Sequence, residues 1–154
     1  MKNYNTLIFD AFDTVVHIYT AHLPSCEIHG KQVRTTAPAV HAVYERRFGQ
    51  LPFGAFYDAF SESYKDISNI RRTELREVSS QERFRALLHR LGVSENRLDS
   101  ETLDSFAHAH MGELEKTFEV RPETIQFLEW AAPRFRRAMI SNFDYSPTLL
   151  TSLE

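Results

Sequence analysis

The residues in this sequence most able to do chemistry follow an apolar run near its N-terminus. Residues 6–9 lead directly into Asp10, and Asp13 and Thr14 come soon after. A short, continuous apolar run is typical of a buried parallel strand. Open α/β sheets bind their ligands beyond the carboxyl ends of such strands. We therefore expect Asp10 at a strand tip, where a reactive carboxylate could meet a ligand.

A second apolar run, at residues 137–140, ends in Ser141 and Asn142. Hydroxyl and amide groups can donate hydrogen bonds to a phosphate or carboxylate oxygen, which makes these two residues candidate substrate-binding groups. A helix expected to begin near Ser146 and Pro147 would add the positive end of its dipole for an anion. The competing interpretation is two ordinary buried strands with polar ends.

Together the two stretches resemble the first and second motifs of the haloacid dehalogenase-like (HAD) hydrolases. Asp10 and Thr14 match the first motif, Asp-x-Asp-x-Thr, and Ser141 matches the hydroxyl residue that ends the second. The resemblance implies an α/β fold, with part of a Rossmann-like parallel sheet and an inserted helical-bundle cap. It also implies that Asp10 attacks a small anionic substrate as a nucleophile. In the family, Mg²⁺ would bind the Asp10 carboxylate and the backbone carbonyl of Phe12.

Phe12 departs from the phosphatase pattern of that family. It stands where phosphatases carry a second aspartate, which protonates the leaving oxygen and later deprotonates water. An aromatic residue at this position resembles the dehalogenase branch, because a halide leaving group needs no proton. Asp13 could substitute as the acid, although a turn-forming aspartate is the plainer interpretation. The substrate therefore stays open between a phosphomonoester and a 2-haloacid.

In the middle of the chain, apolar residues recur at the spacing of an α-helix. Apolar stripes predict four amphipathic helices, with a capping box from Ser79 to Glu82 opening the third and Phe118 on the inner face of the fourth. Four such helices with short connections form a small antiparallel bundle. The expected domains are an incomplete HAD-like core at residues 1–16 and 120–154 and an inserted cap at residues 17–119.

The segment that enters the cap holds weaker candidates. Residues 27–33 fit a small hairpin with its turn at His29. Arg34 could hold a substrate carboxylate, against the simpler interpretation of a surface arginine. His22, Cys26 and His29 could suit Zn²⁺, but their spacing is not a recognised zinc pattern, so a solvated loop is expected.

Composition excludes several classes of protein. The 154 residues carry a net charge of −3 with no basic patch, which argues against a nucleic-acid partner. No apolar run approaches the length of a membrane span, and the first expected strand leaves no room for a signal peptide. A single cysteine, Cys26, excludes an internal disulfide, and a cytoplasmic location is the default expectation.

The chain is short for the fold that it resembles. The family's later motifs are a lysine and an acidic pair, but no lysine follows Lys116. Two parallel strands cannot satisfy their edges alone, so we expect either a fragment that is marginally stable or a homodimer that covers those edges. A non-catalytic HAD-like binding module or an inactive fragment is the alternative to a hydrolase.

Overall fold

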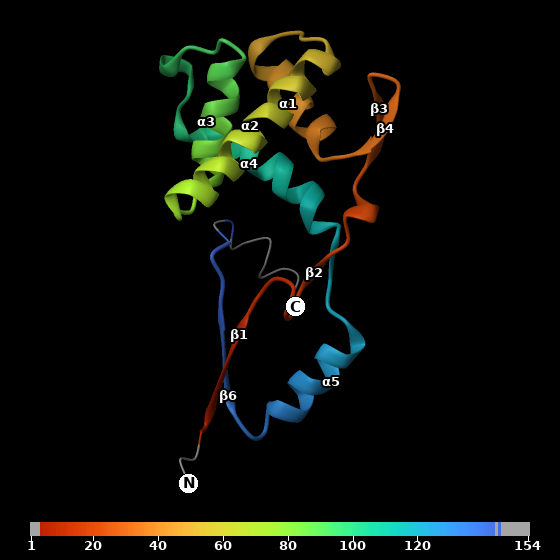
Figure 1. Cartoon of the computed structure of the whole chain (residues 1–154), viewed down its shortest axis with the longest axis vertical. Coiled ribbons are helices and arrows are strands. Elements are labelled where there is room, and N and C mark those ends of the chain that lie inside the picture. The colour runs from red at the N-terminus through yellow and green to blue at the C-terminus, as the bar shows by residue number, and fades with distance from the viewer. Residues whose placement is uncertain (1–3, 144, 146–154) are drawn as a thin grey trace. The chain divides into compact units, whose positions relative to one another are not determined.

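Five α-helices and three two-stranded sheets make up the part of the chain that this computed structural model describes, residues 4–143 and 145 (Figure 1). The chain divides into two compact units. The first comprises residues 1–22 and 115–154, and the second comprises residues 23–114. The mixed α/β class expected from the sequence is therefore confirmed. No helix in the described residues is long and apolar enough to cross a membrane.

The first unit is built on one parallel pair of strands. Strand β1 (Thr6–Asp10) pairs with β6 (Arg136–Ile140), and the register sets Asp10 beside Ile140. Helix α5 (Pro122–Ala131) precedes β6 and begins with proline at its first turn, where a missing N–H costs nothing. The expectation that these two strands are adjacent and parallel is confirmed. Two short strands, β2 (His17–Ile18) and β5 (Phe118–Glu119), form an antiparallel pair in the same unit.

The core of the first unit lies at the loop that follows β1. Ala11, Val15 and Val16 are at most 2% exposed, and burying each valine contributes on the order of 1.5–3 kcal/mol. Partly buried apolar residues from both strands, from α5 and from the chain around β5 pack against them: Phe9, Phe12, Phe118, Val120, Leu128, Met139 and Phe143.

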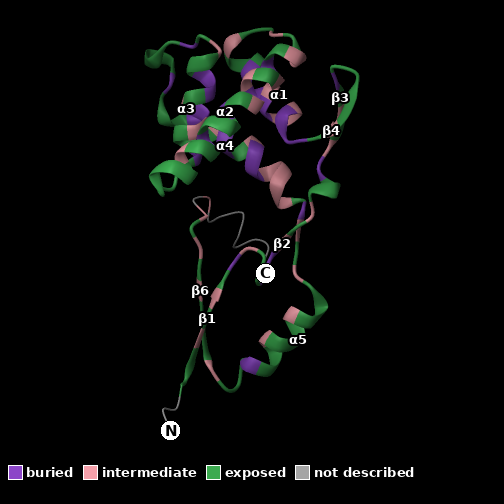
Figure 2. Cartoon of the chain, in the orientation of Figure 1, coloured by how far each residue is buried: buried purple, intermediate pink, exposed green. Residues whose placement is uncertain are grey.

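The prediction that both strands are buried is wrong for the described residues. Ile8 is 62% exposed and Ile140 is 64% exposed, and along β1 exposed and half-buried residues alternate (Figure 2). The half-buried residues Phe9 and Met139 pack towards the core near α5. The opposite face of the sheet stays open, although parallel sheets usually have both faces covered. The apolar run identified the strand, but burial depends on neighbours that a run cannot report.

The second unit contains the four expected helices. They are α1 (Ala37–Phe48), α2 (Phe53–Glu74), α3 (Ser80–Arg90) and α4 (Ser100–Glu115). Phe56, Phe84 and Phe106 are fully buried between them. The Ser79 hydroxyl accepts a hydrogen bond from the Glu82 backbone N–H at 3.2 Å, which confirms the predicted cap of α3. The expectation that Phe118 lies on α4 is wrong, because that helix ends at Glu115 and Phe118 belongs to β5.

The predicted hairpin is present in the second unit. Strand β3 (Ser25–Ile28) pairs with β4 (Lys31–Arg34), and His29 and Gly30 form the turn with φ of 50° and 73°. Two successive positive φ values define the type I′ turn, whose twist matches that of the flanking strands. His29 also pairs with Asp58 of α2 at 2.9 Å, which ties the hairpin tip to the helices. Two 3₁₀ turns, Thr20–His22 and Glu95–Arg97, complete the described elements.

Candidate functional site at the strand tips of the first unit

The parallel pairing of β1 and β6 brings their carboxyl ends to one edge of the sheet. Asp10 is the last residue of β1 and lies beside Ile140, so Ser141 and Asn142 directly follow the neighbouring strand end. Asp10 is exposed, and its carboxylate is open to a ligand. Of the predicted site residues, this geometry therefore brings together Asp10, Ser141 and Asn142.

A tight turn, residues 11–16, follows Asp10. The backbone N–H groups of Val15 and Val16 both donate to the carbonyl of Ala11 at 2.9 Å. Asp13 adopts φ of 57°, a left-handed conformation that aspartate tolerates better than most residues, and its backbone N–H donates to the Val16 carbonyl at 2.9 Å. The turn-forming interpretation of Asp13 agrees with this geometry. Asp13 and Thr14 are both exposed on the turn.

Phe12 is held in an aromatic cluster. Its ring meets that of Phe118 edge-on at 5.2 Å and that of Phe143 edge-on at 4.8 Å, measured between ring centroids. Edge-to-face pairs of this kind are each worth about 0.5–1.5 kcal/mol beyond the area they bury. The ring therefore anchors the loop at a position two residues after Asp10 in the chain. Sequence reasoning missed the two partners, although Phe143 stands immediately after the Ser141-Asn142 pair.

The loop after β6 is also ordered by a local hydrogen bond. The Ser141 hydroxyl oxygen accepts from the Phe143 backbone N–H at 3.1 Å. A hydroxyl that accepts in this way still has its own proton, which it can donate to an anionic oxygen. Ser141 is half-buried and Asn142 is exposed. The helix expected from Ser146 and Pro147 lies outside the described residues.

Arg34 is not among the residues that the strand pair gathers. It ends β4 in the second unit, where its guanidinium donates to the Leu23 carbonyl at 3.0 Å. This hydrogen bond uses part of a donor set that a substrate carboxylate would need. A role for Arg34 in substrate binding stays a prediction.

The described side chains form no cluster of metal ligands. Within residues 4–143 and 145, no three His, Cys, Asp or Glu residues are grouped so that they could hold a metal ion. His22 pairs with Glu119 at 3.3 Å, whereas the Cys26 thiol contacts the Val33 carbonyl and burial raises its pKa. The expectation of a solvated loop is wrong for this segment, because His22 ends a 3₁₀ turn, Cys26 lies half-buried on β3 and His29 forms the hairpin turn.

Comparison with known proteins adds no further assignment. No protein-family model and no curated protein sequence matches this chain.

Proposed function

We propose that this chain carries the nucleophile-bearing part of a HAD-like hydrolase that acts on a small anionic substrate. The observation that carries the proposal is the parallel β1–β6 pair, which sets Asp10 beside the strand end that leads to Ser141 and Asn142. A helical unit of residues 23–114 is inserted between the two strands, as a cap would be in a HAD-type Rossmann-like fold. Neither feature depends on the residue-by-residue match to the family's motifs.

In the proposed reaction, a carboxylate oxygen of Asp10 attacks the substrate and displaces its leaving group, which forms an aspartyl ester. Water then hydrolyses the ester and restores the carboxylate, so that one difficult displacement becomes two easier ones. Ser141 and Asn142 donate hydrogen bonds to the anionic group of the substrate. The exposed position of Asp10 at the end of β1 is compatible with attack on a small molecule.

The packing of Phe12 bears on the leaving group. Because its ring lies against Phe118 and Phe143, this position supplies an apolar wall and no proton. A halide leaves without protonation, whereas a poor alkoxide leaving group needs an acid. The site therefore favours a 2-haloacid or an activated phosphomonoester over an unactivated alkyl phosphate.

Mg²⁺ would be required only for phosphoryl substrates. The Asp10 carboxylate and the Phe12 carbonyl offer two oxygen ligands, and Mg²⁺ commonly keeps several waters in its octahedral shell. When bound there, it would neutralise charge on a phosphoryl group.

A non-catalytic binding module is the second candidate. The specific observation in its favour is the open sheet face, on which Ile8 and Ile140 are more than half exposed. A chain that used this face for a partner would need no turnover at Asp10.

The test is turnover by the purified 154-residue chain and by its Asp10→Asn variant. Short 2-haloacids without metal and an aryl phosphate with Mg²⁺ are the substrates. The variant should lose nearly all activity, because an amide is a very poor nucleophile. Glu129→Gln, which makes the same charge change at an exposed position on α5, should retain it. Near-normal turnover by Asp10→Asn would overturn the assignment, and no turnover by the wild-type chain would agree with the binding module or with an inactive fragment.

A further inference from the structure

The outer edge of β6 is unpaired among the described residues. Its only strand neighbour there is β1. The Arg136 N–H donates to the Asn5 carbonyl at 2.9 Å, so Arg136 directs its backbone groups towards the β1 side. Successive residues of a strand direct their backbone groups to opposite edges. Arg137 and Met139 therefore present N–H and C=O groups to the open edge.

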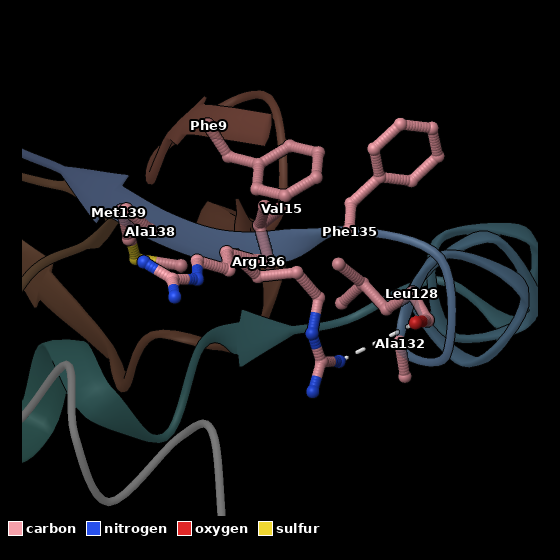
Figure 3. A pocket seen from close by; sticks show the side chains of 9 residues that line it. Phe9, Val15, Leu128, Ala132, Phe135, Arg136, Ala138 and Met139 are labelled. Atoms are coloured by element: carbon pink, nitrogen blue, oxygen red, sulfur yellow. Dashed lines mark hydrogen bonds between the residues drawn. The ribbon is translucent and has the colours of Figure 1, made fainter. Parts of the chain in front are cut away.

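A groove of about 540 Å³ lies between β6 and α5, on the side of the sheet that Phe9 and Met139 face. Four consecutive residues of β6, Arg136 to Met139, line it. Its other walls are apolar, as Figure 3 shows for the labelled side chains: Phe9, Val15, Leu128, Ala132 and Phe135. An extended chain paired with the open edge of β6 would direct alternate side chains towards this apolar side of the sheet.

The charged residues around the beginning of β6 are all positively charged arginines. Arg136 and Arg137 lie at the beginning of β6, and Arg134 lies just before it with its guanidinium over the Trp130 ring. The Arg137 guanidinium donates to the Leu128 carbonyl at 3.3 Å, and Arg134 donates to the Trp130 carbonyl. No carboxylate in the described residues forms an ion pair with any of the three. The remainder of β6, Ala138 to Ile140, is apolar.

We propose that the β6 edge binds an extended peptide segment of a separate protein, in which two adjacent acidic residues adjoin a short apolar run. Strand addition to an open edge gains affinity from main-chain hydrogen bonds and specificity from alternate side chains. The acidic pair lies opposite Arg136 and Arg137, and the apolar run lies opposite Ala138, Met139 and Ile140. An opposite-charge pair across two strands is favourable, and like charges directly opposite are not. This inference is independent of catalysis at Asp10.

The test uses the full chain and a fluorescent peptide with two glutamates followed by three valines. Its binding, measured by fluorescence anisotropy, should exceed that of a matched peptide with two lysines by about tenfold or more, which corresponds to about 1.4 kcal/mol. Hydrogen exchange should show new protection at the amides of Arg137 and Met139 when the glutamate peptide binds. Added salt should weaken the binding, because exposed charges are screened.

Charge reversal provides the specificity control. Arg136→Glu/Arg137→Glu should lose the glutamate peptide and gain the lysine peptide, an outcome that an unfolded variant could not give. Arg136→Glu alone should give part of this effect without disturbing the Arg137 bond to Leu128. Arg72→Glu, an exposed change on α2, should bind as the wild type does. Equal binding of both peptides, protection of the two amides in a peptide-free dimer, or displacement of the peptide by an RNA oligonucleotide would each overturn the proposal.

Discussion

Phe12 has a structural role that limits what can be substituted at this position. Its ring bridges Phe118 and Phe143, and these three side chains join the loop after β1 to β5 and to the loop after β6. Removing the ring therefore disturbs the loops that position Asp10 and Ser141. Any experiment on the leaving group has to separate lost chemistry from lost packing.

Phe12→Asp should raise the hydrolysis of phosphomonoesters with Mg²⁺, because it supplies the missing acid. General acid catalysis is worth about 10²–10⁴-fold, and this range bounds the gain. Phe12→Leu is the matched control, since it removes the ring without adding a carboxyl group. Thermal unfolding of both variants reports the cost of losing the aromatic contacts. Robust hydrolysis of unactivated alkyl phosphates by the wild-type chain would contradict the prediction and would direct attention to Asp13 as the acid.

At the level of single residues, the sequence could place Asp10 and Ser141 but not their surroundings. Both follow apolar runs, and parallel strands end at a common edge, so their proximity was predictable. The aromatic partners of Phe12 were not predictable. Phe118 lies far along the chain, and its spacing from the preceding apolar residues predicted that it belongs to α4. Whether a helix continues for one more turn depends on competing contacts, and here the chain enters β5 instead.

Among the secondary-structure elements, local signals were reliable where one short-range interaction decides the conformation. The cap at Ser79 and the turn at His29 each depend on residues within a few positions, and both were predicted. Strand burial was not predictable, because it depends on whether other elements cover each face. The apolar run predicts that Ile8 is a core residue, but its side chain is exposed in the described structure.

A buried histidine links three elements of the helical unit. Arg83 of α3 donates to His110 Nε2 at 2.9 Å, so Nε2 must be unprotonated. The proton is then on Nδ1, which donates to the hydroxyl of Thr36 at 2.6 Å, just before α1. Burial, together with the charge of Arg83, lowers the pKa of His110 to about 3. In the folded protein this side chain is neutral throughout the physiological pH range.

The free energy of unfolding should fall as the pH drops below about 6.5, the ordinary pKa of histidine. Below that pH, His110 becomes protonated in the unfolded chain, whereas in the folded chain it stays neutral down to about pH 3. This difference in proton binding favours unfolding. The loss is about 1.4 kcal/mol per pH unit across this window. Urea unfolding of the wild type and of His110→Gln at several pH values isolates the effect, with His108→Gln on the exposed side of α4 as the control. Equal pH slopes for the wild type and His110→Gln would show that His110 is not the group responsible.

For the whole molecule, the two units differ in how completely they bury their apolar surface. The helical unit encloses Phe56, Phe84 and Phe106 completely. In the first unit the sheet has two strands, and large apolar residues on β1, β6 and α5 stay substantially exposed: Ile8, Ile125, Phe127, Trp130 and Ile140. Regions with few buried contacts and exposed backbone hydrogen bonds open more readily than cores.

The strands of the first unit should therefore exchange their amide hydrogens much faster than the helices of the second. Hydrogen exchange on the dilute 154-residue chain measures this directly, and light scattering on the same sample reports whether copies associate to cover the strand edges. The amides of Leu7 and Ala138, whose N–H groups face the partner strand in this register, are the informative probes, and those of Leu87 and Leu103, in the helical core, are the reference. Protection should be lower at the first pair, because a two-stranded parallel sheet is marginal without further cover. A monodisperse monomer in which all four amides are equally protected would mean that the pair is stable without any neighbour.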